Sequence, residues 1–176
     1  MTTLVSFLAF CQALGALVGA FTAVWSELAY IRAIRDGHID GAERAHLDVI
    51  AKGLRFGMAL LLLASFGLVV VDFILQATLQ PALSASYWTS ILLAFLIIGV
   101  SWALSRRRIS FAFGSAILFT TWWFLAYLTF GLLPPLSFGA TVAFFVVATG
   151  IFYALLQYAR FLVLHEHLES PKETDA

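Results

Sequence analysis

The sequence predicts an all-α integral membrane protein, a polytopic bundle of five transmembrane helices with its N-terminus outside and its C-terminus inside. Its composition is the first reason, because 62% of the residues are hydrophobic and 11% are charged, whereas soluble domains carry about 25% charged residues. The apolar residues are the second, because they form five runs, each long enough to cross a hydrocarbon core that needs about 17–25 helical residues.

The distribution of basic residues is the third reason, because they all fall on one side of the predicted membrane. They lie in the link after the first run, in the link after the third run, and near the end of the fifth run. The links around 78–86 and 132–136 carry no charge. Since Lys and Arg accumulate in cytoplasmic loops, we expect a multi-pass protein of the cell (inner) membrane with the basic links inside.

The first predicted span covers about 4–31 and has one face of small residues that leads to a carboxylate. The members of this face recur at every fourth position: Cys11, Gly15, Gly19, Ala23 and Glu27. Small side chains let two helix backbones approach closely, which favours helix association in lipid. We therefore expect helix packing through Gly15, Gly19 and Ala23, with Gln12 at the border of the same face.

The link after the first span predicts a cytoplasmic helical extension at about 40–54, which continues into a second span at about 55–77. Asp40 and Glu43 have the spacing of a capping box, in which side chains satisfy the first free amide groups of a helix. The helix is therefore expected to start near Gly41.

Asp72 is the most unusual residue of the second span, because the sequence places no Lys, Arg or His on its side of the membrane. Carboxylates inside a membrane often belong to proton or ion pathways. Asp72 is therefore an ion- or proton-binding candidate, as are Glu27 and Gln12. The alternative is a structural Asp72 that reaches the outer headgroups or is satisfied by neighbouring polar side chains: Gln76, Thr120, Thr121 or Tyr127.

The remaining spans are predicted at about 87–104, 110–131 and 137–162. Aromatic residues lie near their outer boundaries, as interfacial anchors do: Tyr87, Trp88, Trp122, Trp123 and Tyr127. The cluster from Arg106 to Arg108 separates the third span from the fourth and is typical of a stop signal. Pro134 and Pro135 indicate a hairpin between the fourth and fifth spans.

Glu27 and Arg160 are predicted to share one depth in the bilayer, near the inner boundary of the hydrocarbon. Each follows the outer start of its helix by about 23 residues, and helices rise about 1.5 Å per residue. An unpaired charge is costly at that depth, which predicts an ion pair between the first and fifth helices. The alternative is that both side chains extend separately to the inner headgroups.

The four His residues all belong to the predicted cytoplasmic face. Glu43 and His46 are spaced so that a carboxylate and an imidazole share one helical face, and His165 and His167 lie near the C-terminus. Imidazoles and carboxylates bind zinc or iron, and a His pair binds haem iron. A zinc, iron or haem site is therefore an alternative to the main expectation, which is a chain without a cofactor. Solvated polar segments also contain such residues for solubility alone.

The charge balance and the motifs narrow the function. A formal net charge of zero argues against a nucleic-acid partner, because such proteins need basic surface to neutralise phosphates. The sequence contains no nucleophile elbow, phosphate loop or dinucleotide fingerprint, so a non-enzymatic role is expected.

The chain is expected to form one transmembrane domain at 1–164, followed by a short polar cytoplasmic tail at 165–176. The sequence favours a transporter or channel-type protein, or an accessory or assembly subunit. Its partners would be the lipid bilayer and either further copies of the chain or a larger membrane complex. The alternative is a metal- or haem-binding membrane redox protein that uses the cytoplasmic His residues.

Overall fold

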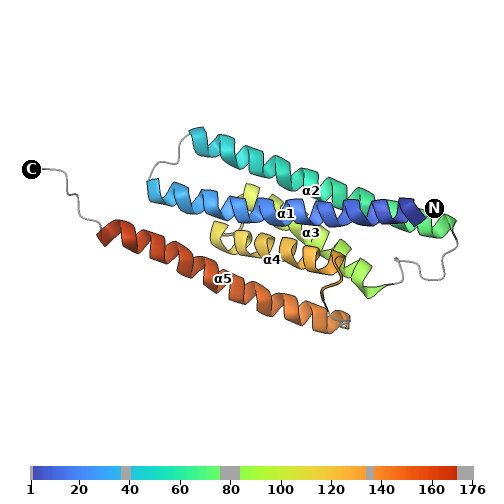
Figure 1. Ribbon diagram of the computed structural model, residues 1–176. Helices are drawn as coiled ribbons and strands as arrows, with labels where there is room; N and C mark the ends of the chain where they lie inside the picture. The colour runs from blue at the N-terminus through green and yellow to red at the C-terminus, as the bar shows by residue number, and fades with distance from the viewer. Residues whose placement is uncertain (1, 37–40, 76–83, 134–136, 170–176) are drawn as a thin grey trace, which may run out of the picture.

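The backbone of the computed structural model is described for residues 2–36, 41–75, 84–133 and 137–169, and side chains for 3–32, 51–75, 84–133, 137–163 and 165 (Figure 1). The helices are α1 (Thr2–Asp36), α2 (Gly41–Ile74), α3 (Ala85–Ser105), α4 (Phe111–Thr129) and α5 (Phe138–Glu169). All five contain a segment long and apolar enough to cross a membrane. The predicted all-helical chain with five such helices is therefore confirmed.

The helix starts follow local hydrogen bonding. The Ser84 hydroxyl accepts a hydrogen bond from the Tyr87 amide at 3.1 Å, and the Ser137 hydroxyl accepts one from the Ala140 amide at 3.3 Å. Both satisfy amide groups that have no partner inside their own helix. Helix α2 begins at Gly41, the residue at which the sequence predicted a helix start, and runs without a break into its apolar segment.

The helices are arranged around α4, which packs against α1, α3 and α5. Helix α1 packs against α2 over much of its length, and the two long helices run side by side in Figure 1. Half of the most apolar window of α4 is buried, compared with 6% of the corresponding window of α5. Helix α4 is therefore the centre of the bundle, and α5 lies along its outside.

The small-residue face of α1 sets the closest helix contact. A Cβ atom on Gly15 would lie 2.8 Å from the Leu61 amide nitrogen and 2.9 Å from the Gly57 carbonyl oxygen of α2. A Cβ atom on Gly19 would overlap the ring of Trp122 of α4, whose side chain is fully buried. Ala23 is also buried. The face therefore lies between α2 and α4, where only small residues fit.

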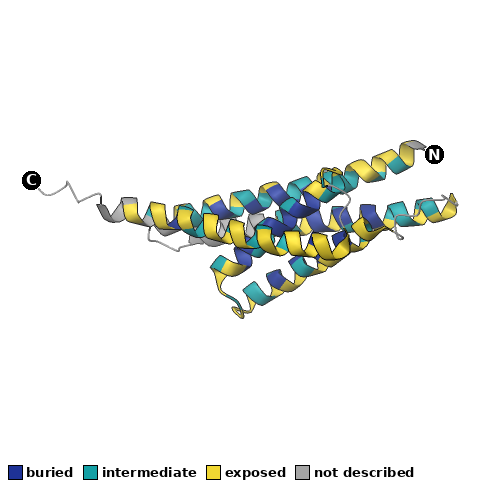
Figure 2. Ribbon diagram, turned by 90° about the horizontal axis from the view of Figure 1, so that it is seen from below, coloured by how far each residue is buried: buried dark blue, intermediate teal, exposed yellow. Residues whose placement is uncertain are grey.

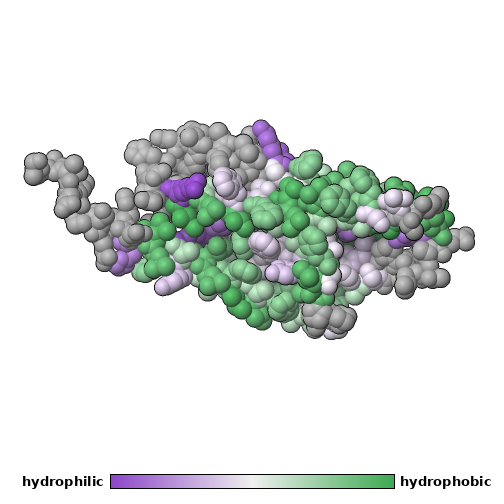
Figure 3. Space-filling model, viewed as in Figure 1, coloured by the Kyte–Doolittle hydropathy of each residue, from purple (hydrophilic) through white to green (hydrophobic). Residues whose placement is uncertain are grey.

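The outer surface of the bundle is apolar. Figure 2 shows the buried residues gathered in the middle of the bundle, with exposed residues on the outer faces of the helices. Many of the exposed side chains are large and hydrophobic, such as Phe21, Leu63, Phe73 and Phe95. Figure 3 shows hydrophobic atoms over most of the described surface on one face. Such extensive apolar exposure is typical of a surface that contacts lipid.

Candidate functional site

Basic side chains gather at one end of the bundle, which we call the basic end. It is formed by the end of α1, the beginning of α2, the turn between α3 and α4, and the second half of α5: Arg32, Lys52, Arg55, Arg106, Arg107, Arg108 and Arg160. In Figure 3, the most strongly hydrophilic described atoms lie mainly in the half of the molecule toward the C-terminus, which is on the left.

A buried ion pair connects α1 to α5 near the basic end. Arg160 Nη2 donates to Glu27 Oε2 at 2.6 Å, and the two side chains are 6% and 7% exposed. The same nitrogen donates to the Ser115 hydroxyl of α4 at 2.8 Å. These are the two residues for which the sequence predicted a shared depth. Glu27 therefore enters the site as one half of a neutral pair.

Aromatic rings surround the guanidinium group of Arg160. Its central carbon lies 4.8 Å from the centre of the Tyr30 ring and 5.9 Å from the centre of the Phe111 ring. Arg160 Nε and Nη1 are buried and have no hydrogen-bond partner among the described residues. The ring faces attract the cation, and together with Glu27 they hold it in an otherwise apolar setting.

A cavity of about 1080 Å³ lies beside this ion pair. It is lined by residues of α1, α2, α3 and α4 and of the turn between α3 and α4. Its charged and hydroxyl lining residues all lie toward the basic side, among apolar ones such as Leu104, Ile109 and Phe111: Ser26, Glu27, Arg55, Ser101, Ser105, Arg107 and Ser115. Its other end is lined by apolar side chains: Met58, Leu62, Ile97, Leu118 and Phe119. The polar lining of the cavity is therefore confined to one end, which we call its polar end, and the other end is apolar.

Two cations, Arg55 and Arg107, line the polar end of the cavity, and both side chains are exposed. Among the described residues, neither has a carboxylate within ion-pair distance. Because Glu27 is already paired with Arg160, it does not neutralise them. Among the described lining side chains, the polar end of the cavity therefore carries a net positive charge.

Arg107 adopts an unusual backbone conformation that follows from its place in the turn. Its φ angle is 53°, a left-handed conformation that non-glycine residues seldom adopt. Its amide donates to the Leu104 carbonyl, and the Arg108 amide donates to the Ala103 carbonyl, both at 2.9 Å. These two bonds make a Schellman motif, a helix ending whose left-handed position is usually glycine.

The adjacent residues Arg106 and Arg108 lie against Trp102 and do not line the cavity. The guanidinium carbons of Arg106 and Arg108 lie 5.8 Å and 5.9 Å from the centre of the Trp102 ring. Trp102 is 54% exposed and does not line the cavity. The sequence interpretation of these three arginines as a single stop signal therefore missed a difference between them, since only Arg107 lines the cavity.

The other predicted ion-binding residues do not converge on this cavity. Gln12 donates from Nε2 to the Ser65 hydroxyl of α2 at 2.9 Å, about 22 Å along α1 from Glu27 at 1.5 Å per residue. The Ser65 hydroxyl in turn donates to the Leu61 carbonyl of its own helix at 2.7 Å. Gln12 therefore joins α1 to α2 inside the bundle.

Asp72 is half-buried near the end of α2. The hydroxyls of Thr120 and Thr121, which the sequence offered as partners, donate to carbonyls of their own helix. In the described part of the chain, α2 is not among the helices that α4 packs against. The ion- or proton-binding role of Asp72 stays a prediction.

The proposed metal ligands lie largely beyond the described side chains. The side chains of Glu43, His46 and His167 are outside the described residues. His165 is exposed, with its ring centre 5.8 Å from that of Phe161. Among described side chains, no group of three or more His, Cys, Asp or Glu residues comes together. The zinc, iron or haem alternative therefore stays a prediction.

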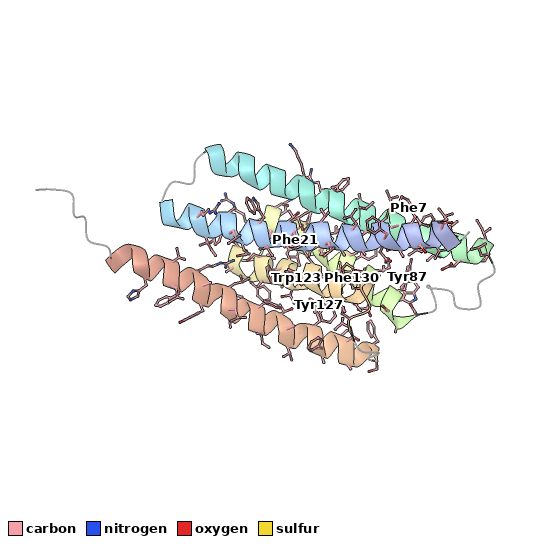
Figure 4. The ribbon with its side chains drawn as sticks, in the orientation of Figure 1. Phe7, Phe21, Tyr87, Trp123, Tyr127 and Phe130 are labelled. Carbon is pink, nitrogen blue, oxygen red and sulfur yellow. The ribbon has the colours of Figure 1, made fainter. Side chains whose placement is uncertain are left out.

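A series of aromatic rings follows α4 away from the basic end. Figure 4 labels Phe21 of α1 with Trp123 and Tyr127 of α4; the ring centres are 6.2 Å apart for Phe21 and Trp123, and 6.4 Å apart for Trp123 and Tyr127. A second cavity, of about 810 Å³, lies between α4 and α5 and is lined mainly by aromatic and aliphatic residues. It contains no charged side chain among its described lining residues.

The geometry thus gives a class of protein: an all-helical chain whose five helices are each long and apolar enough to span a membrane, with a cavity next to a buried ion pair. Comparison with known protein families, with curated proteins and with solved structures finds no match to this chain.

Proposed function

We propose that this chain is a non-enzymatic, multi-pass membrane protein of the transport type, in which the cavity at the basic end receives a ligand from one side of the membrane. The observation that supports this proposal is the distribution of polar side chains along the cavity. Its charged and hydroxyl side chains lie toward the basic end, and on α4 the positions beyond Phe119 include the fully buried side chains of Trp122 and Leu125. Its volume of about 1080 Å³ matches the upper end of ligand pockets, about 300–1,000 Å³.

The orientation of the protein belongs to the same proposal. Basic residues favour the cytoplasmic side of a membrane, so the basic end would face the cytoplasm, with the N-terminus outside and the C-terminus inside the cell (inner) membrane. The cavity would then be filled from the cytoplasm or from the inner leaflet.

Access to the cavity can be tested with single cysteines, because the chain contains one Cys. In a Cys11→Ala background, Ser101→Cys places a thiol in the cavity wall. Phe95→Cys is the matched control on the same helix, because Phe95 is 67% exposed on the outer surface and does not line the cavity. Both variants are treated with a membrane-impermeant maleimide, in inside-out vesicles and in right-side-out vesicles.

The expected result is rapid labelling of Ser101→Cys from the basic side only, because a thiol in a wet cavity ionises and reacts. The Phe95→Cys thiol should stay unlabelled, because apolar surroundings suppress the thiolate. If Ser101→Cys reacts no faster than Phe95→Cys from either side, the cavity is not an open binding site and the proposal is wrong.

An accessory or assembly subunit is the second candidate function, and the exposure of α5 favours it. Only 6% of the most apolar window of α5 is buried against the rest of the chain, so its surface is available to a partner helix as well as to lipid. Stable co-purification of a stoichiometric membrane partner in mild detergent, lost when outward-facing residues such as Val146 and Leu155 are changed to Ser, would support this candidate. Purification of the chain alone in every mild detergent would contradict it.

A further inference from the structure

We propose that the cavity at the basic end binds one anionic phospholipid, with its phosphate at Arg55 and Arg107 and an acyl chain along the apolar half. This inference rests on the proposed function, because it needs the cavity to be open, and it names the class of ligand. The lipid would come from the leaflet that surrounds the basic end.

The change of polarity along the cavity favours an amphiphile over a small polar solute. On α2 alone, the lining runs from Ala51 at the basic end to Leu62 in the bundle, which is about 16 Å at 1.5 Å per residue. The serines and arginines of the lining all lie in the outer part, beside apolar residues such as Leu104 and Ile109, and the inner part is lined by Met58, Leu62 and Phe119. A polar solute would leave this inner part without a matching surface, whereas a hydrocarbon chain fills it and gains from apolar contact.

The charge at the polar end favours an anion. Glu27 also lines this end, but Arg160 holds its carboxylate at 2.6 Å, so this pair adds no net charge. Arg55 and Arg107 remain as the cations of the lining. A guanidinium group presents parallel N–H donors that match two oxygens of a phosphate, which makes Arg a strong phosphate ligand.

The backbone conformation of Arg107 supports a role for its side chain in ligand binding, in addition to any effect of its charge on membrane orientation. Helix α4 ends in the same motif as α3: the Gly131 amide donates to the Leu128 carbonyl at 3.1 Å, and the Leu132 amide to the Tyr127 carbonyl at 3.0 Å. There the left-handed position is Gly131, with φ 65°. The turn after α3 thus carries Arg107 at the left-handed position where the equivalent turn after α4 carries glycine.

The other arginines of the turn do not share this position. Arg106 and Arg108 lie over the exposed ring of Trp102. Trp102 does not line the cavity. A general attraction to the inner leaflet would use all three arginines equally. Their different placement therefore predicts that Arg107 affects lipid binding more strongly than its neighbours.

The arrangement of the helices also provides a lateral route. Helices α2 and α3, which both line the cavity, contact each other little, and the lining residue Ile98 of α3 is 48% exposed. A lipid can therefore place its chain between α2 and α3 directly from the bilayer, with its headgroup at the basic end.

The test uses the purified protein in a mild non-ionic detergent and measures binding by isothermal titration calorimetry with three probes. Dioctanoyl phosphatidylglycerol carries both the anion and the chains, dioctanoyl phosphatidylcholine carries the chains without net charge, and inorganic phosphate carries the anion alone. We expect the phosphatidylglycerol to bind saturably at one site. The phosphatidylcholine should bind more weakly by about tenfold or more, because its headgroup has no net charge to attract the arginines. Inorganic phosphate should show no saturable binding.

Arg107→Gly is the decisive variant. It removes the cation but suits the left-handed backbone, so the thermal stability without lipid should stay equal or rise. Its affinity for phosphatidylglycerol should fall by about ten- to a hundredfold, the usual effect of losing a charged hydrogen bond. Arg55→Gln should act in the same direction, and Arg106→Gln, which removes the charge of the adjacent residue in the same turn, should leave the affinity within about twofold.

The assignment is wrong if phosphatidylglycerol fails to bind, if inorganic phosphate binds as tightly, or if Arg106→Gln and Arg107→Gly weaken binding equally. Labelling of Ser101→Cys separates this failure from a failure of the proposed function. If Ser101→Cys is reactive and phosphatidylglycerol neither binds nor slows its labelling, the cavity is open and the lipid assignment alone is overturned. If Ser101→Cys is unreactive, the open cavity itself is overturned.

Discussion

At the scale of single residues, the ion pair between Glu27 and Arg160 is the main polar contact inside the bundle, and it joins residues 133 positions apart. Removing two charges from water is costly, so a buried pair adds little stability compared with an apolar pair. Removing one partner is different, because it leaves the other charge buried without compensation. Arg160 is held by Glu27, Ser115 and the ring of Tyr30, and its neutralising partner among these is Glu27 alone.

Glu27→Gln is therefore expected to destabilise the protein by about 3–5 kcal/mol, the usual effect of breaking a buried ion pair. Thermal unfolding in mild detergent, followed by circular dichroism, measures this change. The double variant Glu27→Gln, Arg160→Gln should unfold at a higher temperature than Glu27→Gln, because no charge is then left unpaired. Arg32→Gln is the control for an exposed charge and should change stability by less than about 0.5 kcal/mol.

An unfolding temperature of Glu27→Gln equal to that of the unmodified protein would show that the pair does not stabilise the fold. Equal destabilisation by Arg32→Gln would show that the effect belongs to the net charge of the basic end and not to this contact.

At the scale of the helices, α1 and α5 use opposite ways of joining the bundle. Helix α1 packs by close backbone approach through Gly15 and Gly19. Helix α5 is mostly exposed and is held by Arg160 and by aromatic contacts, such as Phe124 with Phe145 at 5.5 Å. Backbone approach tolerates no added side-chain volume, whereas ring contacts on an open surface do.

Gly19→Ala is therefore expected to destabilise the bundle by about 1–3 kcal/mol, because the added methyl group overlaps the buried ring of Trp122 and overpacking of a filled core has this cost. Gly150→Ala on α5 is the matched control, since a Cβ atom there meets nothing within 4 Å. It should be neutral or stabilising by up to about 1 kcal/mol, because Ala favours helix more than Gly does.

Thermal unfolding in the same detergent compares the two substitutions. Equal unfolding temperatures for Gly19→Ala and Gly150→Ala would contradict the close packing of α1 against α4.

At the scale of the whole molecule, the basic end and the apolar surface define one axis. The helices that line the cavity bring their basic residues to the same end of the bundle, and the cavity has its polar part there. The positive charge that favours one orientation in the membrane is therefore also the charge that surrounds the cavity. In the proposed function, the same arginines would therefore set both the orientation of the protein and the charge of its ligand.

This link predicts that the basic end faces the cytoplasm. A green fluorescent protein fused after Ala176 should be fluorescent, and alkaline phosphatase fused at the same point should be inactive, because the C-terminus would lie inside. Fusions in the predicted outer link at 78–86 should give the reverse pattern. An active phosphatase at the C-terminus would place the cavity on the outer side and contradict the proposed orientation.

The sequence was informative wherever one helix could be considered alone. The five apolar runs, the start of α2 at Gly41 and the small-residue face of α1 all depend on local spacing. The shared depth of Glu27 and Arg160 depends only on helix rise and direction, so it too could be predicted, whereas their contact also required α1 and α5 to face each other. The cavity could not be predicted from the sequence. It depends on how few contacts α2 and α3 make with each other, and the periodicity of a single helix does not encode this.

By itself, the sequence determined the class of structure, because apolar length and composition fix how many helices can cross a bilayer. It also determined which face of α1 is packed, because small residues every fourth position admit a second backbone. Only the tertiary structure decided which neighbour each face meets, and so that Gly19 lies against Trp122 and that Arg107, among three adjacent arginines, lines a cavity. The physical reason is that the direction of a side chain at a helix end depends on the φ angle of the turn and on the surrounding helices. The positions of those helices are set by packing between distant parts of the chain.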